Sequence, residues 1–134
     1  MGQSNAGNFG QTRKVASANV LTFFNGKLRR AADPIPGADG TGGSVWTRLG
    51  DKIIAAGLYD QVIFIPVSVG GTEIAQWTPD MPLFKRVTAA IEGANKAKLV
   101  ITHVFWHQGE SDAYLKTSWA DYQLRFRNLV KGLR

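Results

Sequence analysis

Residues 61–69 read QVIFIPVSV, a nearly continuous apolar run in which hydrophobic and polar side chains do not alternate. A second run of the same kind, LVITHVFWH, occupies residues 99–107. Strands that are buried on both faces have this composition, which is typical of parallel sheets covered by helices. The two runs therefore predict two buried parallel strands at the centre of the fold.

Helical periodicity surrounds both runs. Before the first, Val45, Leu49 and Ile53 recur every four residues, with Ser44 as the expected cap and Gly57 as the expected end. Two more helices are predicted, one from Pro82 and one from Ser118. Their apolar positions are Leu83, Val87 and Ile91 in one, and Trp119, Tyr122, Phe126, Leu129 and Leu133 in the other.

A hairpin is predicted ahead of these elements. Residues 19–24 are rich in Val, Leu and Phe, Asn25-Gly26 is a strong hairpin turn signal, and residues 27–32 form the expected return strand. The order hairpin, helix, strand, helix, strand, helix predicts an α/β fold with a parallel sheet and helices on its faces.

Length and composition limit the class of protein. The chain has 134 residues, 44% of them hydrophobic, and a formal net charge of +6, which suits one globular domain. It contains no cysteine, which excludes a disulfide scaffold, a thiolate zinc site and a cysteine nucleophile. Arg29-Arg30 and Lys85-Arg86 are isolated pairs, so the basic charge predicts a solvated surface and no nucleic-acid partner. No signal peptide or membrane-spanning run is visible, which leaves the compartment open.

Three polar, glycine-containing segments are expected at the carboxyl edge of the sheet, where open α/β sheets bind ligands. They are residues 2–7 (GQSNAG), residues 69–72 (VGGT) and residues 107–112 (HQGESD). Each can donate and accept hydrogen bonds close to a flexible backbone. The first segment lies there only if a strand leads into it.

The residue types in these segments fit acyl transfer. Ser4 can present a hydroxyl and its own backbone N–H on a tight turn. Gly70 and Gly71 can turn N–H groups outward, and Gln108 offers an amide donor, which are the parts of an oxyanion hole. Glu110 could orient a histidine base of the kind that a serine nucleophile requires.

Taken singly, each feature has a simpler interpretation. His103 and His107 lie four residues apart on one predicted strand and could face a metal, but a third ligand is not evident, so packing is favoured. Trp77 is expected to pack in the interior, although aromatic rings also line sugar sites. Residues 37–43 (GADGTGG) lack the lysine of a phosphate loop, which argues against nucleotides.

The combination is more specific than its parts. GQSNAGN at 2–8, VSVGGTEIAQW at 67–77 and FWHQGESDA at 105–113, in this order, resemble the SGNH (GDSL-like) hydrolases. More narrowly, they resemble the sialate O-acetylesterase and acetylxylan esterase branch of the carbohydrate esterases. This resemblance implies a flavodoxin-like three-layer α/β/α sandwich with a parallel central sheet. It also implies hydrolysis of O-acetyl esters on carbohydrates through an acyl-enzyme, with no cofactor and no metal.

The resemblance also implies roles for individual residues. Ser4 would be the nucleophile, and its N–H, that of Gly71 or Gly70, and the Gln108 side chain would form the oxyanion hole. Glu110 would be the acid of a Ser-His-Glu triad, although other members take an Asp from a later Asp-x-x-His motif. The remaining motif residues, Asn5, His107 and Asp112, would support the site.

Two parts of the family pattern have no counterpart here: the strand before GQSN and the Asp-x-x-His motif after HQGESD. Residues 1–134 are therefore expected to form a single domain that is incomplete at both ends. The alternative to an active esterase is an inactive carbohydrate-binding or structural module. The expected partner is an acetylated carbohydrate, with no membrane contact. Association with a second copy or a complementing chain segment is a further expectation.

Overall fold

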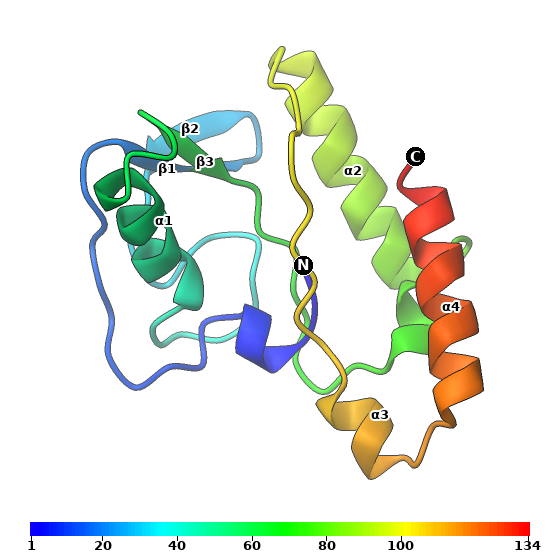
Figure 1. Ribbon diagram of the computed structural model, residues 1–134. Helices are drawn as coiled ribbons and strands as arrows, with labels where there is room; N and C mark the ends of the chain where they lie inside the picture. Colours follow the sequence, from blue (N-terminus) through cyan, green and yellow to red (C-terminus); the bar gives the residue numbers. More distant parts are fainter.

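The computed structural model of the protein describes all residues from 1 to 134. Its first strands form a hairpin. Strand β1 (Val20–Phe24) pairs antiparallel with β2 (Lys27–Arg30) through a turn in which Asn25 and Gly26 both have positive φ, 49° and 74°. Strand β3 (Val62–Phe64) adds parallel to β1, so the sheet order is β2-β1-β3 (Figure 1). The predicted hairpin is confirmed, because its turn chemistry is local.

Four α-helices and two 3-10 turns complete the fold: α1 (Val45–Ala55), α2 (Pro82–Lys96), α3 (Glu110–Tyr114), α4 (Trp119–Gly132), η1 (Ser4–Ala6) and η2 (Ile74–Trp77). The three helices predicted from periodicity are confirmed, whereas the short α3 was not predicted. Ser118 caps α4 as expected, since its Oγ accepts from the Asp121 N–H at 3.1 Å. Ser44 occupies the cap position of α1, but its hydroxyl donates to Asp33 instead, at 2.7 Å. No helix combines the length and apolar character needed to span a bilayer.

The prediction of two buried strands is wrong in extent. The first run is a strand only over β3, and the second, residues 99–107, is not a regular strand. Instead, Val100 is 87% exposed and Val104 is 56% exposed. A strand requires a hydrogen-bonded neighbour along its length, and the second run pairs only at its end, where the His107 N–H donates to Met1 O at 3.0 Å. An apolar run indicates burial but does not supply a pairing partner.

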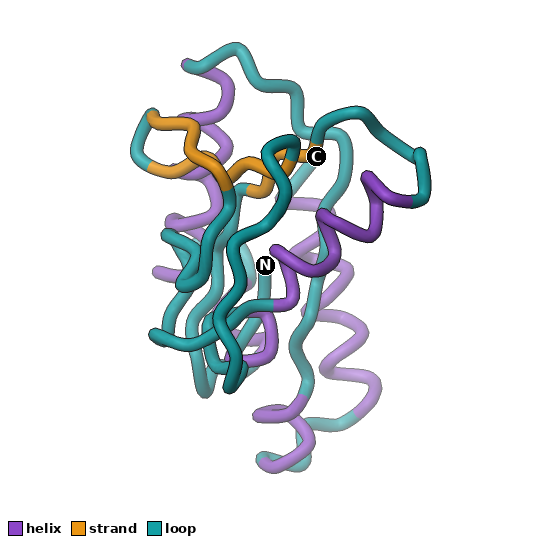
Figure 2. Tube along the Cα trace, turned by 90° about the vertical axis from the view of Figure 1, so that its left-hand side faces the viewer, coloured by secondary structure: helices purple, strands orange, loops and turns teal.

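Residues 1–3 form the middle of three short parallel segments. Gly2 bridges Ser68 on one side and His107 on the other, both in parallel orientation. The sheet as a whole is mixed, because β2 is antiparallel to β1, so the expected parallel central sheet is present only as the β1–β3 pair and these isolated bridges. Figure 2 shows the strands gathered together, with loops making up much of the remaining chain.

The buried side chains form two clusters. The first joins α1 to the sheet and contains Val20, Trp46 and Phe64. The second joins α2, α4 and η2, and its most buried side chains are Trp77 and Ile74, at 0% exposure, and Leu129, at 1%. Each side chain of this size stabilises the fold by about 1.5–3 kcal/mol on burial. Figure 1 shows residues 99–107 running between the α1 half and the α2–α4 half.

An exposed ion pair fastens the loop before β1 to α1, and it makes a pH-dependent contribution to stability. Lys14 Nζ lies 2.6 Å from Asp51 Oδ2, and the Ser17 N–H donates to Asp51 Oδ1 at 2.8 Å. The hydrogen bond from Lys14 lowers the pKa of Asp51 from 3.8 to about 2, with help from Ser17. A carboxyl with a lowered pKa stabilises the folded state above the unfolded pKa, and the contribution disappears as the pH falls from about 4 to about 2.

We therefore expect Asp51→Asn to lower the free energy of unfolding by less than about 1 kcal/mol at pH 7, since the pair is solvent-screened. The difference from the unsubstituted protein should vanish near pH 2. Thermal unfolding at both pH values measures this, with Asp60→Asn, an exposed carboxyl without an ion pair, as the control. An equal difference at both pH values would show that Asp51 acts through packing.

Candidate active site

The turn that carries Ser4 is held against the backbone of residue 107. Gly2 has φ +142°, and a Cβ placed there would lie 2.0 Å from His107 O, so only glycine allows this approach. Immediately after it, η1 turns Ser4 out of the paired segment. The Ser4 side chain is half-buried, and its hydroxyl makes no hydrogen bond within the protein. The serine is therefore exposed to a ligand on a rigidly held turn.

Gln3 joins this turn to the HQGESD segment by hydrogen bonds. Sequence reasoning gave this residue no role. Its side chain is buried, and its Oε1 accepts from Gln108 Nε2 at 3.1 Å, from the Ser111 N–H at 3.2 Å and from the Gly109 N–H at 3.4 Å. A buried amide oxygen that serves several donors fixes the segments it joins, because losing it would leave those donors unsatisfied. The first and third segments therefore meet through Gln3.

The glycine segment lies on the other side of Ser4. A Cβ placed on Gly70 would be 3.9 Å from Ser4 Cβ. The Gly70 N–H donates to Asp39 Oδ2 at 3.2 Å, whereas the N–H groups of Gly71 and Ser4 have no acceptor in the structure. Gly71 also has a φ of +70°, which a glycine adopts at little cost. Of the two glycines, Gly71 is thus the one with an unused donor.

Gln108 connects all three segments. Its Nε2 lies within hydrogen-bond distance of Thr72 O (2.9 Å), Gln3 Oε1 and Asp112 Oδ2, and its Oε1 accepts from the Tyr122 hydroxyl at 2.9 Å. An amide has two N–H donors, so both are used within the protein in this conformation. Its role as an oxyanion donor stays a prediction.

The two carboxylates of HQGESD have different surroundings. Asp112 is buried, its Oδ2 accepts from the Ile74 N–H at 2.8 Å, and its Oδ1 has no partner. Glu110 is exposed at the start of α3, and its Oε1 accepts from Asn5 Nδ2, next to Ser4. Asp112 therefore fixes the start of η2, while Glu110 remains available near the serine.

The Tyr122 side chain of α4 belongs to the hydrogen-bond network around Gln108. Trp106 Nε1 donates to the Tyr122 hydroxyl at 3.1 Å. Burial raises the pKa of the Tyr122 phenol; the Trp106 hydrogen bond opposes this effect, and the charges of Asp112 and Glu110 add to it. The phenol therefore keeps its proton and can donate to Gln108.

Neither histidine contacts Ser4. His107 is exposed, and its side chain makes no hydrogen bond. His103 Nδ1 is 3.0 Å from Thr102 Oγ1, and its ring lies edge-on to Tyr59. No three His, Asp or Glu side chains gather in the structure as a group that could hold a metal ion. Trp77 packs in the interior, as predicted, with Trp106 against its ring at 5.6 Å.

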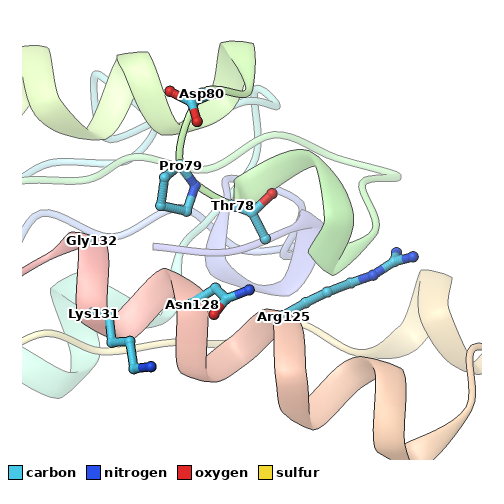
Figure 3. Close-up of a pocket in the computed structure, with 7 residues that line it drawn as sticks. All are labelled: Thr78, Pro79, Asp80, Arg125, Asn128, Lys131 and Gly132. Carbon is cyan, nitrogen blue, oxygen red and sulfur yellow. The ribbon is translucent and has the colours of Figure 1, made fainter.

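Two of the hollows on the surface lie near these elements. One of about 430 Å³ lies beside the Ser4 turn and is lined by Gln3, Gly71, Glu110, Ser111, Tyr114 and Leu115. The other, of about 590 Å³, lies between α4 and the loop before α2 (Figure 3). Figure 3 shows that its side chains come from that loop and one face of α4, and none belongs to the three polar segments. The hollow beside Ser4 is therefore the candidate substrate site.

The fold and site define an α/β protein with polar loops gathered around one serine. A family model described as carbohydrate esterase, sialic acid-specific acetylesterase, matches residues 1–134, and the chain belongs to this family. Among solved structures, the chain is similar to an Arabidopsis thaliana protein at 23% identity and a TM-score of 0.73. The match covers 88% of this chain and 52% of the plant protein, so the chain spans about half that protein's length. This likeness concerns the fold alone. No curated protein matches the chain.

Proposed function

We propose that this chain carries the nucleophile and the oxyanion hole of a serine esterase that removes acetyl groups from carbohydrate. Membership of a carbohydrate esterase family supports the general activity. The observation that carries the proposal is the surroundings of Ser4. Its hydroxyl is unbonded, two unused N–H groups belong to Ser4 itself and to Gly71, and Gly70 lies against the serine.

The proposed reaction has two steps. Ser4 Oγ bonds to the acetyl carbon while the ester bond to the sugar breaks, and the sugar oxygen takes up the proton that Ser4 releases. Water then hydrolyses the acetyl-serine to acetate. The N–H groups of Ser4 and Gly71 would stabilise the negative charge on the carbonyl oxygen. Gln108 would add a third donor once one of its N–H groups turns from Thr72 O or Asp112 to the substrate.

The proton has to pass through a base, which we propose is a histidine oriented by Glu110. Glu110 is an exposed carboxylate that contacts the serine turn, because its Oε1 accepts a hydrogen bond from the Asn5 side chain. Neither His103 nor His107 contacts Ser4 in the structure. The proposal therefore requires that a base reaches Ser4 in the whole protein, so that the reaction can turn over.

We also propose that the sheet belongs to a flavodoxin-like three-layer sandwich. The adjacent residues Phe105 and Trp106 turn to opposite sides. Phe105 lies 6.0 Å from Trp46 of α1, and Trp106 lies 6.3 Å from Phe126 of α4, measured between ring centroids. This alternation is the one that a central strand between two helix layers would show.

A small fluorophosphonate, which labels activated serines, tests the proposed nucleophile. We expect labelling of the intact protein by one equivalent, mapped by peptide mass spectrometry to Ser4. Ser111 is an internal control, since it lines the hollow beside the Ser4 turn and its hydroxyl is also unbonded. Equal labelling of both serines, or labelling of Ser111 alone, would remove Ser4 from the nucleophile role.

A further inference from the structure

Phe9 is an exposed aromatic ring that rests on glycine backbone. Its side chain is 54% exposed. A Cβ placed on Gly7, Gly40 or Gly70 would approach the atoms of the ring to 3.0–3.1 Å. A side chain at any of the three positions would therefore push the ring away by a few tenths of an ångström. The phenyl ring thus has a seat of glycine backbone, made by Gly7, Gly40 and Gly70, which have no side chains.

The seat is rigid. Asn8, the preceding residue, is buried, and its Nδ2 donates to Ile35 O and Ala38 O, both at 2.9 Å. Its Oδ1 accepts from the Ile35 N–H at 2.7 Å. On the other side, the Gly10 N–H donates to Gly43 O at 2.9 Å. The backbone is fixed before and after Phe9, so little freedom would be lost when a ligand covers the ring.

The ring lies next to the nucleophile. Gly70 contacts both, because a Cβ there would be 3.1 Å from Phe9 Cζ and 3.9 Å from Ser4 Cβ. Phe9 belongs to neither buried cluster, so the fold gains little from it. The exposed half of this aromatic ring is thus available to contact a ligand next to Ser4.

We propose that Phe9 is the platform on which the sugar ring of the substrate stacks, so that the acetyl ester reaches Ser4 across Gly70. This inference rests on the proposed function and adds a specificity-determining residue to it. A phenyl ring that is half open matches the apolar C–H face of a pyranose in size, whereas an acetyl methyl group would cover only a fraction of it. The residue acts by orienting the alcohol part of the ester.

Two acetyl esters test the proposal in the full-length protein: a triacetylated methyl xyloside, and triacetin, which has no ring. Phe9→Ala should lower kcat/KM about tenfold for the xyloside and less than about threefold for triacetin. Phe9→Tyr, which keeps the ring, should restore the xyloside rate to within about threefold. The matched control is Phe24→Ala, which removes another phenyl ring seated against a glycine, Gly37, and should not alter the ratio of the two rates.

An equal loss for both esters, or no loss for either, would overturn the role of Phe9 and leave the esterase proposal standing. If neither ester is hydrolysed by the unsubstituted protein, the esterase proposal fails. In that case, saturation-transfer NMR from the Ser4→Ala protein to the ring protons of the xyloside tests the binding role of Phe9 without catalysis. The signal should disappear in Ser4→Ala/Phe9→Ala, and its persistence would overturn the proposal. Phe9→Leu, which keeps most of the volume, replaces the alanine variant if that variant does not fold.

Discussion

Replacing Ser4 by alanine is expected to abolish acetyl release while leaving the protein folded. If Ser4 is the nucleophile, its loss removes the covalent step, and the rate should fall by a factor of at least about a thousand. Stability should change by less than about 0.5 kcal/mol, because the hydroxyl makes no hydrogen bond and the side chain is only half-buried. Acetate release and the melting temperature are the two measurements.

Ser111→Ala is the matched control for this substitution. Ser111 lines the hollow beside the Ser4 turn, and its backbone N–H, which the substitution keeps, is the group bonded to Gln3. Its replacement should change the rate by less than about tenfold and give the same small effect on stability. If Ser4→Ala retains activity within a few-fold of the unsubstituted protein, another group performs the chemistry, and the family membership would then describe the fold without its serine mechanism.

The elements that sequence predicts well are those whose signals are local. Asn25-Gly26 specifies a turn by its own backbone preferences, and the four-residue spacing of Val45, Leu49 and Ile53 specifies a helix face. The run at residues 99–107 carries an equally clear apolar signal, yet only its end is paired. A strand depends on neighbours that its own sequence does not contain.

The same distinction applies to the site. The order of the three polar segments indicated that they would gather, and the structure places them in contact through Gln3 and Gln108. Their hydrogen bonds could not be predicted, because two of the acceptors of Gln108, Gln3 Oε1 and Thr72 O, lie in distant parts of the chain. The difference between Gly70 and Gly71 likewise depends on Asp39, a residue about thirty positions away that takes up one N–H and leaves the other free.

A large loss of stability is expected from Gly2→Ala. The added Cβ would lie 2.0 Å from His107 O and 2.7 Å from His107 C, and both are backbone atoms that cannot rotate away. Residue 2 is paired on both sides, since its N–H donates to Val67 O, its carbonyl accepts from Val69, and the next N–H donates to His107 O. Relief of the clash would therefore break hydrogen bonds in a segment that pairs with two others. We expect a loss of about 3 kcal/mol or more in the free energy of unfolding.

Gly57→Ala separates this clash from the cost of the backbone conformation. Gly57 also has a positive φ, +66°, but nothing lies within 4 Å of a Cβ placed there. Its substitution should cost only about 1–2 kcal/mol, the usual penalty for a left-handed residue. Chemical denaturation of both variants measures the difference. Equal losses would mean that the contact between residues 2 and 107 is looser than the structure shows. A much larger loss for Gly2→Ala would show that the backbone of residue 2 packs against His107 as closely as the structure indicates.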